Sequence, residues 1–263
     1  MHTAPPPLPL ALLIDPDCDL AQAARLVESL RLPLVESAQA AVLLLRLDRE
    51  RLSLCKPGDV ELPGSLWVDF SGPQARHRQN HAGQELLVRA TRVRHTASPL
   101  VIDAAAGLGR DGFLLAAAGF RVRMCERNPV IAALLNDGLR RAAATPDLAA
   151  IVRRITLIAG DALDTLAQPE EPPDVVYLDP MFPPRSKSAK VKQELRLLQL
   201  IEDGRDNGEA LLRAALLAGA RKVVVKRPLK GPLLGDLPPA YTLRGKAVRF
   251  DVYVGPPKGW AGQ

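Results

Sequence analysis

Short apolar runs alternate with helical stretches from Leu100 onward, and this alternation restricts the folds open to the chain more than any other feature. Strands that are joined through helices need crossover connections, which produce a parallel sheet covered by helices on both faces. The sequence therefore predicts an α/β fold built on a mostly parallel sheet. We expect strands over residues 100–103, 121–126, 155–158, 174–178 and 222–226, and helices over 111–118, 129–144, 194–200 and 209–218.

The end of the chain follows a different pattern. Residues 241–244 and 247–254 are two strand-like runs separated only by the Gly245-Lys246 pair, which favours an antiparallel hairpin. With the five strands before it, this hairpin predicts a sheet of seven strands.

The first seventy residues have the pattern of a separate, smaller α/β unit. Apolar runs at residues 10–14, 41–47 and 51–54 accompany one helical stretch over 20–30, for which Asp19 is a suitable N-cap. No catalytic constellation appears in this part. We predict a small N-terminal α/β unit at residues 1–70, a basic linker and helix at 71–98 with the helix over 84–94, and a large α/β domain at 99–263.

Composition narrows the class of protein. Of the 263 residues 47% are apolar, which is ordinary for a packed core, and the net charge of +6 favours a polyanionic partner. Cys18, Cys55 and Cys125 are far apart and form no C-x-x-C pair, so we expect neither disulfides nor a zinc site. The apolar run near the start is too short for a membrane span, and the opening residues lack a basic signal region. We therefore expect a cytoplasmic protein without a membrane segment or a metal.

A glycine-rich turn follows the first expected strand of the large domain. Asp103 ends that strand, and Gly107, Gly109 and Gly112 follow it where a helix is expected to begin. Glycine lets the backbone turn sharply and approach a ligand closely, and a helix start presents unpaired N–H groups. The turn predicts a nucleotide-type cofactor, although several nucleotide-binding families share this spacing.

Acidic residues end the next two expected strands. Glu126 follows the glycine turn by about twenty residues, at a place where a carboxylate can accept hydrogen bonds from both ribose hydroxyls of an adenosine cofactor. Asp161 and Ala162 come after the third strand, where the aspartate can accept from the adenine amino group and the alanine can offer its backbone N–H to the ring. An ordinary helix N-cap is the alternative role for Asp161.

The expected strand over residues 174–178 leads into Asp179-Pro180-Met181-Phe182, at the sheet edge where doubly wound proteins bind ligands. The exocyclic amine of a base is a poor nucleophile because its lone pair is delocalised into the ring. The Asp179 carboxylate and the Pro180 carbonyl can accept the amine hydrogens and so direct the lone pair at an electrophilic methyl group, while Phe182 stacks on the base. We interpret Asp179, Pro180 and Phe182 as the catalytic residues.

This motif resembles the [D/N]-P-P-[Y/F] signature of amino-group methyltransferases, with Met181 in place of the second proline. Residues 107–111, 125–129, 177–183, 223–228 and 249–253 together resemble the ribosomal RNA small subunit methyltransferase J family, which methylates a guanine 2-amino group in bacterial 16S ribosomal RNA. The resemblance covers residues 67–254. It implies a Rossmann-like class I methyltransferase fold, with a mostly parallel seven-stranded sheet and a terminal antiparallel hairpin.

The resemblance also implies S-adenosylmethionine (SAM) as the cofactor of a methyltransferase domain at residues 99–263. By motif, it adds Arg110, Asp111, Arg127 and Asp179 to the cofactor contacts expected from the strand ends. The candidate cofactor-binding residues are therefore Asp103, Gly107, Gly109, Arg110, Asp111, Glu126, Arg127, Asp161, Ala162 and Asp179.

Cations follow the Asp179 motif on a segment that we expect to be a loop, and others lie upstream of the domain and after the fifth strand. Contacts between such cations and phosphates would position RNA without reading its sequence. The predicted RNA-contacting residues are Arg76, Arg78, Arg185, Lys187, Lys190, Lys192, Lys226 and Arg227.

These features together predict methylation of the exocyclic 2-amino group of a guanosine in small-subunit ribosomal RNA, with ribosomal RNA or the small ribosomal subunit as partner. The target base would leave its stack and lie over Phe182. Three alternatives stay open. Adenine or a protein glutamine side chain presents a similar planar amine, a NAD-dependent oxidoreductase fits the glycine spacing and Glu126, and a non-catalytic RNA-binding factor fits the charge.

Overall fold

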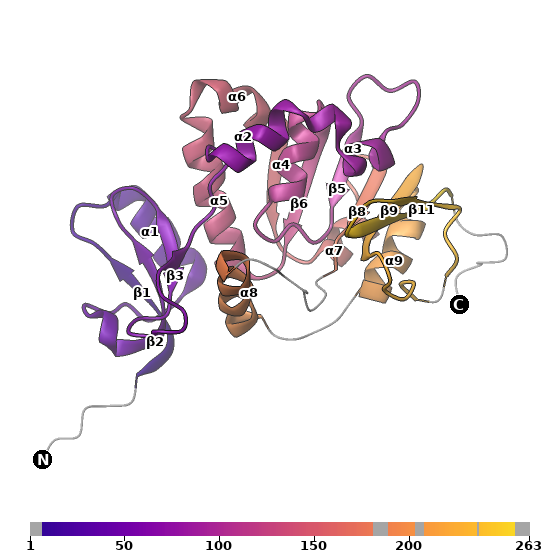
Figure 1. The fold of residues 1–263 in the computed structure, drawn as a ribbon. Helices are drawn as coiled ribbons and strands as arrows, with labels where there is room; N and C mark the ends of the chain where they lie inside the picture. The colour runs from indigo at the N-terminus through magenta and orange to yellow at the C-terminus, as the bar shows by residue number, and fades with distance from the viewer. Residues whose placement is uncertain (1–6, 181–188, 203–207, 236, 256–263) are drawn as a thin grey trace, which may run out of the picture. The chain divides into compact units, whose positions relative to one another are not determined.

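The computed structural model describes residues 7–180, 189–202, 208–235 and 237–255 (Figure 1), and for residues 189–192 it describes the backbone alone. The chain forms two compact units. The first comprises residues 1–68, 129–138 and 183–204, and the second comprises residues 69–128, 139–182 and 205–263. Each unit therefore draws on several stretches of sequence, and the predicted bounds of 1–70, 71–98 and 99–263 stay a prediction.

The first unit contains a four-stranded sheet in the order β1-β2-β3-β4. The pair β1 and β2 is parallel, because helix α1 connects them, and the remaining pairs are antiparallel. Asp19 caps α1 as predicted, since its carboxylate accepts from the Ala21 and Gln22 backbone N–H groups at 2.9 and 3.2 Å. The elements are β1 (Leu8–Ile14), α1 (Leu20–Leu30), a 3-10 turn (Ala38–Ala40), β2 (Ala41–Leu47), β3 (Leu52–Cys55), β4 (Ser65–Leu66) and α8 (Ala189–Ile201).

A buried carboxylate ties helix α5 (Pro129–Ala143) into this first unit. Asp137 is 2% exposed, and it accepts from the Gln22 side chain at 2.9 Å and from the Leu52 backbone N–H at 3.1 Å. The Cβ position of Gly138 lies 2.5 Å from Val68 Cγ1, so the helix packs too closely there for any larger residue. The first ten residues of α5 thus belong to the first unit, and the rest of the helix belongs to the second.

The second unit contains the predicted seven-stranded sheet, in the order β10-β11-β9-β8-β5-β6-β7. Five neighbouring strands are parallel, and β11 and β10 close the sheet in antiparallel pairing. The class I methyltransferase architecture is therefore confirmed. The strands are β5 (Leu100–Asp103), β6 (Arg121–Glu126), β7 (Ile155–Ala159), β8 (Val175–Leu178), β9 (Lys222–Pro228), β10 (Tyr241–Arg244) and β11 (Val248–Tyr253).

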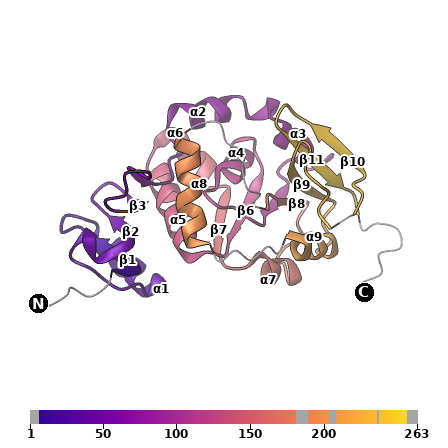
Figure 2. The ribbon, with the colours of Figure 1, turned by 60° about the horizontal axis from the view of Figure 1, so that its bottom comes forward.

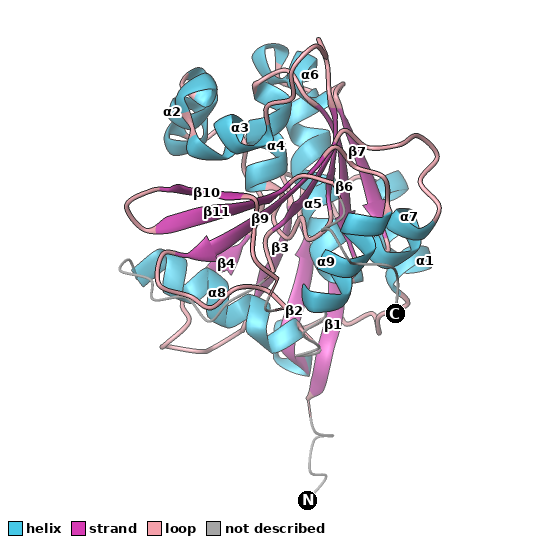
Figure 3. Ribbon diagram, turned by 90° about the vertical axis from the view of Figure 1, so that its right-hand side faces the viewer, coloured by secondary structure: helices cyan, strands magenta, loops and turns pink. Residues whose placement is uncertain are grey.

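Helices cover both faces of this sheet. Figures 2 and 3 show α4 on one face, with α3 beside it, and α7 and α9 on the other. The crossover connections that the alternating pattern predicted account for this layering. The helices of the second unit are α2 (Pro73–Asn80), a 3-10 turn (Ala82–Gln84), α3 (Leu86–Thr91), α4 (Arg110–Ala117), α6 (Pro146–Val152), α7 (Ala162–Ala167) and α9 (Gly208–Leu217).

The sequence prediction of this unit was wrong in several places. Residues 73–80 were expected to be linker but form α2, whose side chains are almost all polar and so show no apolar periodicity. The helix expected over 84–94 is shortened to α3, and α6 and α7, of seven and six residues, were not predicted. In the first unit, the segment after Asp179 that was expected to be a loop is helical from Ala189 onward.

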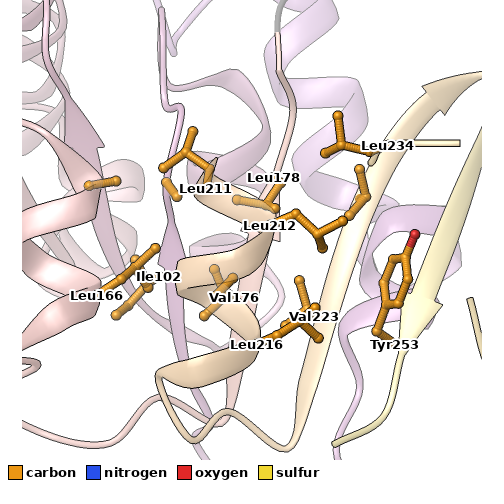
Figure 4. Packing of buried hydrophobic residues seen from close by; sticks show 14 of the residues in the cluster. Ile102, Leu166, Val176, Leu178, Leu211, Leu212, Leu216, Val223, Leu234 and Tyr253 are labelled. Atoms are coloured by element: carbon orange, nitrogen blue, oxygen red, sulfur yellow. The ribbon is translucent and has the colours of Figure 1, made fainter. Parts of the chain in front are cut away.

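An apolar cluster fixes α9 against the middle of the sheet. Leu212 and Leu216 of α9 pack with Val176 of β8 and Val223 of β9, and all four side chains are at most 5% exposed (Figure 4). Burial of this kind contributes roughly 1.5–3 kcal/mol for each large side chain. The cluster therefore packs α9 against β8 and β9, two of the strands that carry residues of the site described next.

None of the helices in the described part of the chain is both long and apolar enough to span a membrane.

Candidate functional site

The chain order reverses between β5 and β8, which are neighbours in the sheet although β6 and β7 lie between them in sequence. Ligands of doubly wound proteins bind at such a reversal, outside the carboxyl ends of the strands. Asp103 and Glu126 end β5 and β6, Asp179 directly follows β8, and Lys226 lies in β9 directly after Val225, the partner of the last residue of β8. The candidate site is therefore at this edge.

The glycine turn adopts a backbone that requires glycine. Gly107 has φ +53° and Gly109 has φ +72°, both in the left-handed region, and Gly109 is the N-cap of α4. The Cβ position of Gly107 has no atom within 4 Å, so the turn leaves open space beside its backbone. In contrast, a Cβ atom at Gly112 would lie 2.6 Å from Met124 Cε and 2.9 Å from Asp103 Oδ2, so this glycine permits close packing of helix on strand.

Glu126 joins the end of β6 to the glycine turn. Its carboxylate accepts from the Gly107 backbone N–H and from the Asn128 backbone N–H, each at 2.8 Å, and the residue is 8% exposed. Burial raises the pKa of Glu126, and these hydrogen bonds partly oppose that rise. Glu126 is thus a fixed acceptor beside the open turn, where a ribose contact was predicted.

Asp161 performs the alternative role considered for it. Its carboxylate accepts from the Leu163 backbone N–H at 3.0 Å and so caps α7, while the adjoining Ala162 is buried. The cap does not exclude a contact between Asp161 and an adenine, because a carboxylate has further lone pairs. The cofactor contacts of Asp161 and Ala162 stay predictions.

Asp103 is a buried carboxyl group at the end of β5. It is 1% exposed, and its Oδ1 atom has no hydrogen-bond partner among the described residues. Burial raises the pKa of Asp103 well above its ordinary value, and the neighbouring charges of Asp111 and Asp179 raise it further. A buried acceptor without a donor is costly in the interior, which makes it a candidate for contact with a bound molecule.

Lys226 lies between two carboxylates. Its Nζ atom donates to Asp179 Oδ2 at 2.8 Å and to Asp111 Oδ2 at 2.6 Å. The three residues come from β9, from the turn after β8 and from the first turn of α4, so the fold brings together positions far apart in sequence. The Lys226 side chain is 26% exposed, and that of Asp179 is 36% exposed.

Other groups fix Asp111 in place. The Tyr177 hydroxyl donates to Asp111 Oδ2 at 2.9 Å, and the Arg78 guanidinium donates to Asp111 Oδ1 at 3.3 Å. Arg78 in turn donates to Glu85 at 3.1 Å. A connected set of hydrogen bonds thus runs from α2 to Asp179.

The pKa values in this set move in directions that the geometry explains. Burial raises the pKa of Asp179, Lys226 opposes this rise, and Asp111 adds to it. Burial acts on Asp111 in the same sense, but Lys226, Arg78 and Tyr177 together hold its pKa below the ordinary value. Although burial alone would lower the pKa of Lys226, its two carboxylate partners raise it above the ordinary value. Lys226 is therefore charged at neutral pH.

The structure changes the interpretation of three predicted residues and adds to that of a fourth. Lys226 and Arg78 were predicted to contact RNA, but their cationic groups face the carboxylates of the site. Arg227 is 2% exposed and donates to the Pro232 carbonyl at 2.9 Å, so we no longer count it among the RNA-contacting residues. Asp111 was predicted to bind the cofactor, and its carboxylate receives donors from Arg78, Tyr177 and Lys226, so its cofactor contact stays a prediction.

The remaining predicted residues are placed as follows. Arg110 and Arg76 are exposed, Arg127 is half-buried, and Pro180 is buried after Asp179. The Arg76 guanidinium donates to the Ser71 carbonyl at 2.9 Å and lies 3.6 Å from Asp147.

For the other predicted residues no side chain is described. The backbone of α8 includes Lys190 and Lys192, while Phe182, Arg185 and Lys187 lie outside the described residues.

Sequence reasoning missed the joint role of Tyr177 and Lys226. The sequence did contain a signal for the buried position of Lys226. This lysine comes directly after three valines, Val223 to Val225, that are buried on a strand in the core. A cation in that position needs an anionic partner.

Within the described residues, no group of three or more His, Cys, Asp and Glu side chains has an arrangement that could hold a metal ion.

Comparisons with known proteins agree with this geometry. A family model described as "Putative SAM-dependent methyltransferase" matches residues 25–255. Ribosomal RNA small subunit methyltransferase J of Pseudomonas aeruginosa (strain UCBPP-PA14) is 45% identical over 240 residues, which cover 89% of this chain and 91% of that protein. The protein of the same name from Thioalkalivibrio sulfidiphilus is 45% identical over 238 residues, which cover 89% and 92%.

A solved structure has the same architecture. The SAM-dependent methyltransferase of Neisseria gonorrhoeae superposes with a TM-score of 0.76 and is 34% identical, covering 95% of this chain and 97% of that chain. This likeness extends over both units of the chain.

Proposed function

The chain belongs to the ribosomal RNA small subunit methyltransferase J family of SAM-dependent methyltransferases, and from this membership we propose that it methylates the 2-amino group of a guanosine in small-subunit ribosomal RNA. The observation that carries the proposal is the position of Asp179. Its carboxylate lies at the carboxyl edge of the sheet, at the chain reversal that also carries the glycine turn and Glu126.

The residues at this edge fit SAM. The open space beside Gly107 gives a close approach to the backbone, Glu126 offers carboxylate oxygens for ribose hydroxyls, and the unpartnered Oδ1 atom of Asp103 is a buried acceptor. Arg110, Arg127, Asp161 and Ala162 are the further contacts that we propose. When bound, SAM supplies an electrophilic methyl group on a sulfonium centre.

The residues of the chain then act on the base. We propose that the Asp179 carboxylate and the Pro180 carbonyl accept the two amine hydrogens and so orient the nitrogen lone pair. Positive charge develops on the amine as it reacts, and the Asp179 carboxylate stabilises this charge. Phe182 stacks on the base after it leaves its helix.

The proposal includes the partner and its location. Arg76, Arg185, Lys187, Lys190 and Lys192 are the residues that we propose to contact phosphates of the ribosomal RNA or the small subunit. The names of the relatives and the net charge of +6 support this partner. The relatives are bacterial proteins, and bacterial ribosomal RNA lies in the cytoplasm, so we propose a cytoplasmic location for this chain.

The substrate is tested by mass spectrometry of nucleosides from 16S ribosomal RNA. Deletion of the gene is expected to remove one N2-methylguanosine, and the wild-type gene is expected to restore it, whereas a gene carrying Asp179→Ala is expected not to. An unchanged N2-methylguanosine content accompanied by the loss of a methylated adenosine, or of a methylated protein glutamine, would assign a different acceptor.

The cofactor contact is tested by calorimetry with S-adenosylhomocysteine. Glu126→Gln removes a charged acceptor, and hydrogen bonds to charged groups contribute about 1.5–3 kcal/mol each, so we expect the Kd to rise by about 10–150-fold. Glu28→Gln is the matched control, because Glu28 is exposed on α1, and it is expected to leave the Kd unchanged. Equal affinities for the Glu126→Gln variant and the wild type would contradict the ribose contact, and binding of NAD alone would contradict the cofactor.

A further inference from the structure

Lys226 has contacts unlike those of a surface lysine that binds RNA. It stands on β9 directly after three buried valines, and its ammonium group hydrogen-bonds to both Asp179 and Asp111. A phosphate would have to compete with two carboxylates that are already at hydrogen-bond distance. The ammonium charge of Lys226 therefore acts inside the site.

Asp111 holds this lysine from the other side. Its carboxylate lies in the first turn of α4, where the helix dipole favours an anion, and it is fixed by the Tyr177 hydroxyl and the Arg78 guanidinium. Because these two donors hold Asp111, its carboxylate sets the position of the lysine. Lys226 in turn sets the position of Asp179 Oδ2.

The contact between Lys226 and Asp179 affects the protonation state of Asp179, because opposing influences act on that carboxyl group. Burial and the nearby carboxylate of Asp111 favour the protonated form of Asp179, and Lys226 favours the ionised form. A protonated carboxyl would lose both its negative charge and part of its capacity to accept hydrogen bonds. The titratable or charged groups that face this set are Asp103 from β5, Asp111 from α4, Tyr177 from β8, Lys226 from β9, and Arg78 with Glu85 from the α2–α3 segment.

We propose that Lys226 is a positioning residue for methyl transfer, whose ammonium group, anchored by Asp111, keeps the Asp179 carboxylate ionised and oriented toward the amine of the base. This inference deepens the proposed function and rests on it. Lys226 acts through Asp179 and touches neither the base nor the phosphates.

The kinetic test compares two substitutions that differ in charge. Lys226→Gln keeps a hydrogen-bond donor but removes the charge, and it is expected to lower kcat at pH 7 by about tenfold or more. The KM for small-subunit RNA is expected to stay within about twofold of wild type. Lys226→Arg keeps the charge and is expected to retain most of the activity.

The pH profile separates positioning from a merely structural role. In the wild type kcat should fall as the pH decreases through the pKa of Asp179, and in Lys226→Gln this fall should move to higher pH. Activity of the variant should therefore recover toward the wild-type value as the pH is raised. Lys246→Gln is the control for loss of one positive charge, because Lys246 is exposed in the turn between β10 and β11, and it should leave kcat and its pH profile unchanged.

A second measurement does not depend on catalysis. In protein labelled with ¹³C at the aspartate carboxyl carbons, the Asp179 resonance, assigned through its loss in Asp179→Ala, should titrate at higher pH in Lys226→Gln than in the wild type. An unshifted titration would overturn the inference, as would a Lys226→Gln enzyme with unchanged kcat and a raised KM for RNA. If the wild type fails to methylate small-subunit RNA, the proposed function fails, while the titration still decides the role of Lys226 toward Asp179.

Discussion

Replacing Asp179 with alanine is expected to lower kcat for methyl transfer to small-subunit RNA by about 10²–10³-fold, which is typical when one preorganised group that stabilises developing charge is lost. The reason is that the amine would lose both an acceptor for its hydrogen and the negative charge beside it. The measurement is the transfer of labelled methyl from SAM to small-subunit RNA. Affinity for S-adenosylhomocysteine should change much less than kcat, because most of the proposed cofactor contacts lie on other strands.

Two further variants sharpen this experiment. Asp179→Asn keeps an acceptor oxygen without the charge, so it should retain more activity than Asp179→Ala. Asp17→Ala is the control, since Asp17 is exposed in the first unit, and it should have wild-type activity. A wild-type rate for Asp179→Ala would show that the proposed mechanism is wrong.

Replacing Arg249 with methionine is expected to lower the free energy of unfolding by about 3–5 kcal/mol, the usual cost of removing one partner from a buried ion pair. Arg249 is 6% exposed and pairs with Asp251, which is 1% exposed, at 3.0 Å. Its guanidinium also donates to the carbonyls of Pro228, Gly231 and Pro232 at 3.0, 2.6 and 3.1 Å. The substitution leaves the buried Asp251 carboxylate without its cationic partner and removes the donor to these carbonyls.

Urea denaturation measures this effect. Arg244→Met is the matched control on the neighbouring strand β10, where the arginine is exposed, and it should change the free energy of unfolding by no more than about 0.5 kcal/mol. The double variant Arg249→Met, Asp251→Asn should be more stable than Arg249→Met, because no buried charge is then left unpaired. An unfolding midpoint equal to wild type in Arg249→Met would contradict the importance of this pair.

Most of the second unit was predictable because its strands have a strong and simple signal. The bounds of β5, β6 and β10 agree residue for residue with the prediction, since each is a compact run between clear turns. In contrast, α2 was missed because a polar surface helix has no apolar stripe. This helix is stabilised by contacts with neighbouring residues, which the spacing of apolar residues does not reveal. For example, the Gln79 side chain donates to the Phe70 carbonyl at 2.8 Å.

A residue of the site could be predicted only where the sequence of the strand before it is enough to place it at the edge of the sheet. Glu126 and Asp179 come directly after apolar runs, so their location could be inferred from local sequence. The partnership of Lys226 with Asp111 depends on how α4 and β9 meet in three dimensions, 115 residues apart in the chain. From the sequence alone, Lys226 was grouped with the other cations after the fifth strand, and this led to the prediction of an RNA contact.

The division of α5 between the two units has a consequence for experiments that dissect the protein. Deleting residues 1–68 removes Gln22 and Leu52, the donors to the buried Asp137, and also Val68, which packs on Gly138. In such a fragment, Asp137 would lose these two donors and Gly138 would lose its packing against Val68, on a helix that also contributes to the second unit. Loss of activity on truncation would then report damaged folding as readily as a lost RNA contact, so point substitutions are the cleaner way to assign a task to the N-terminal sheet.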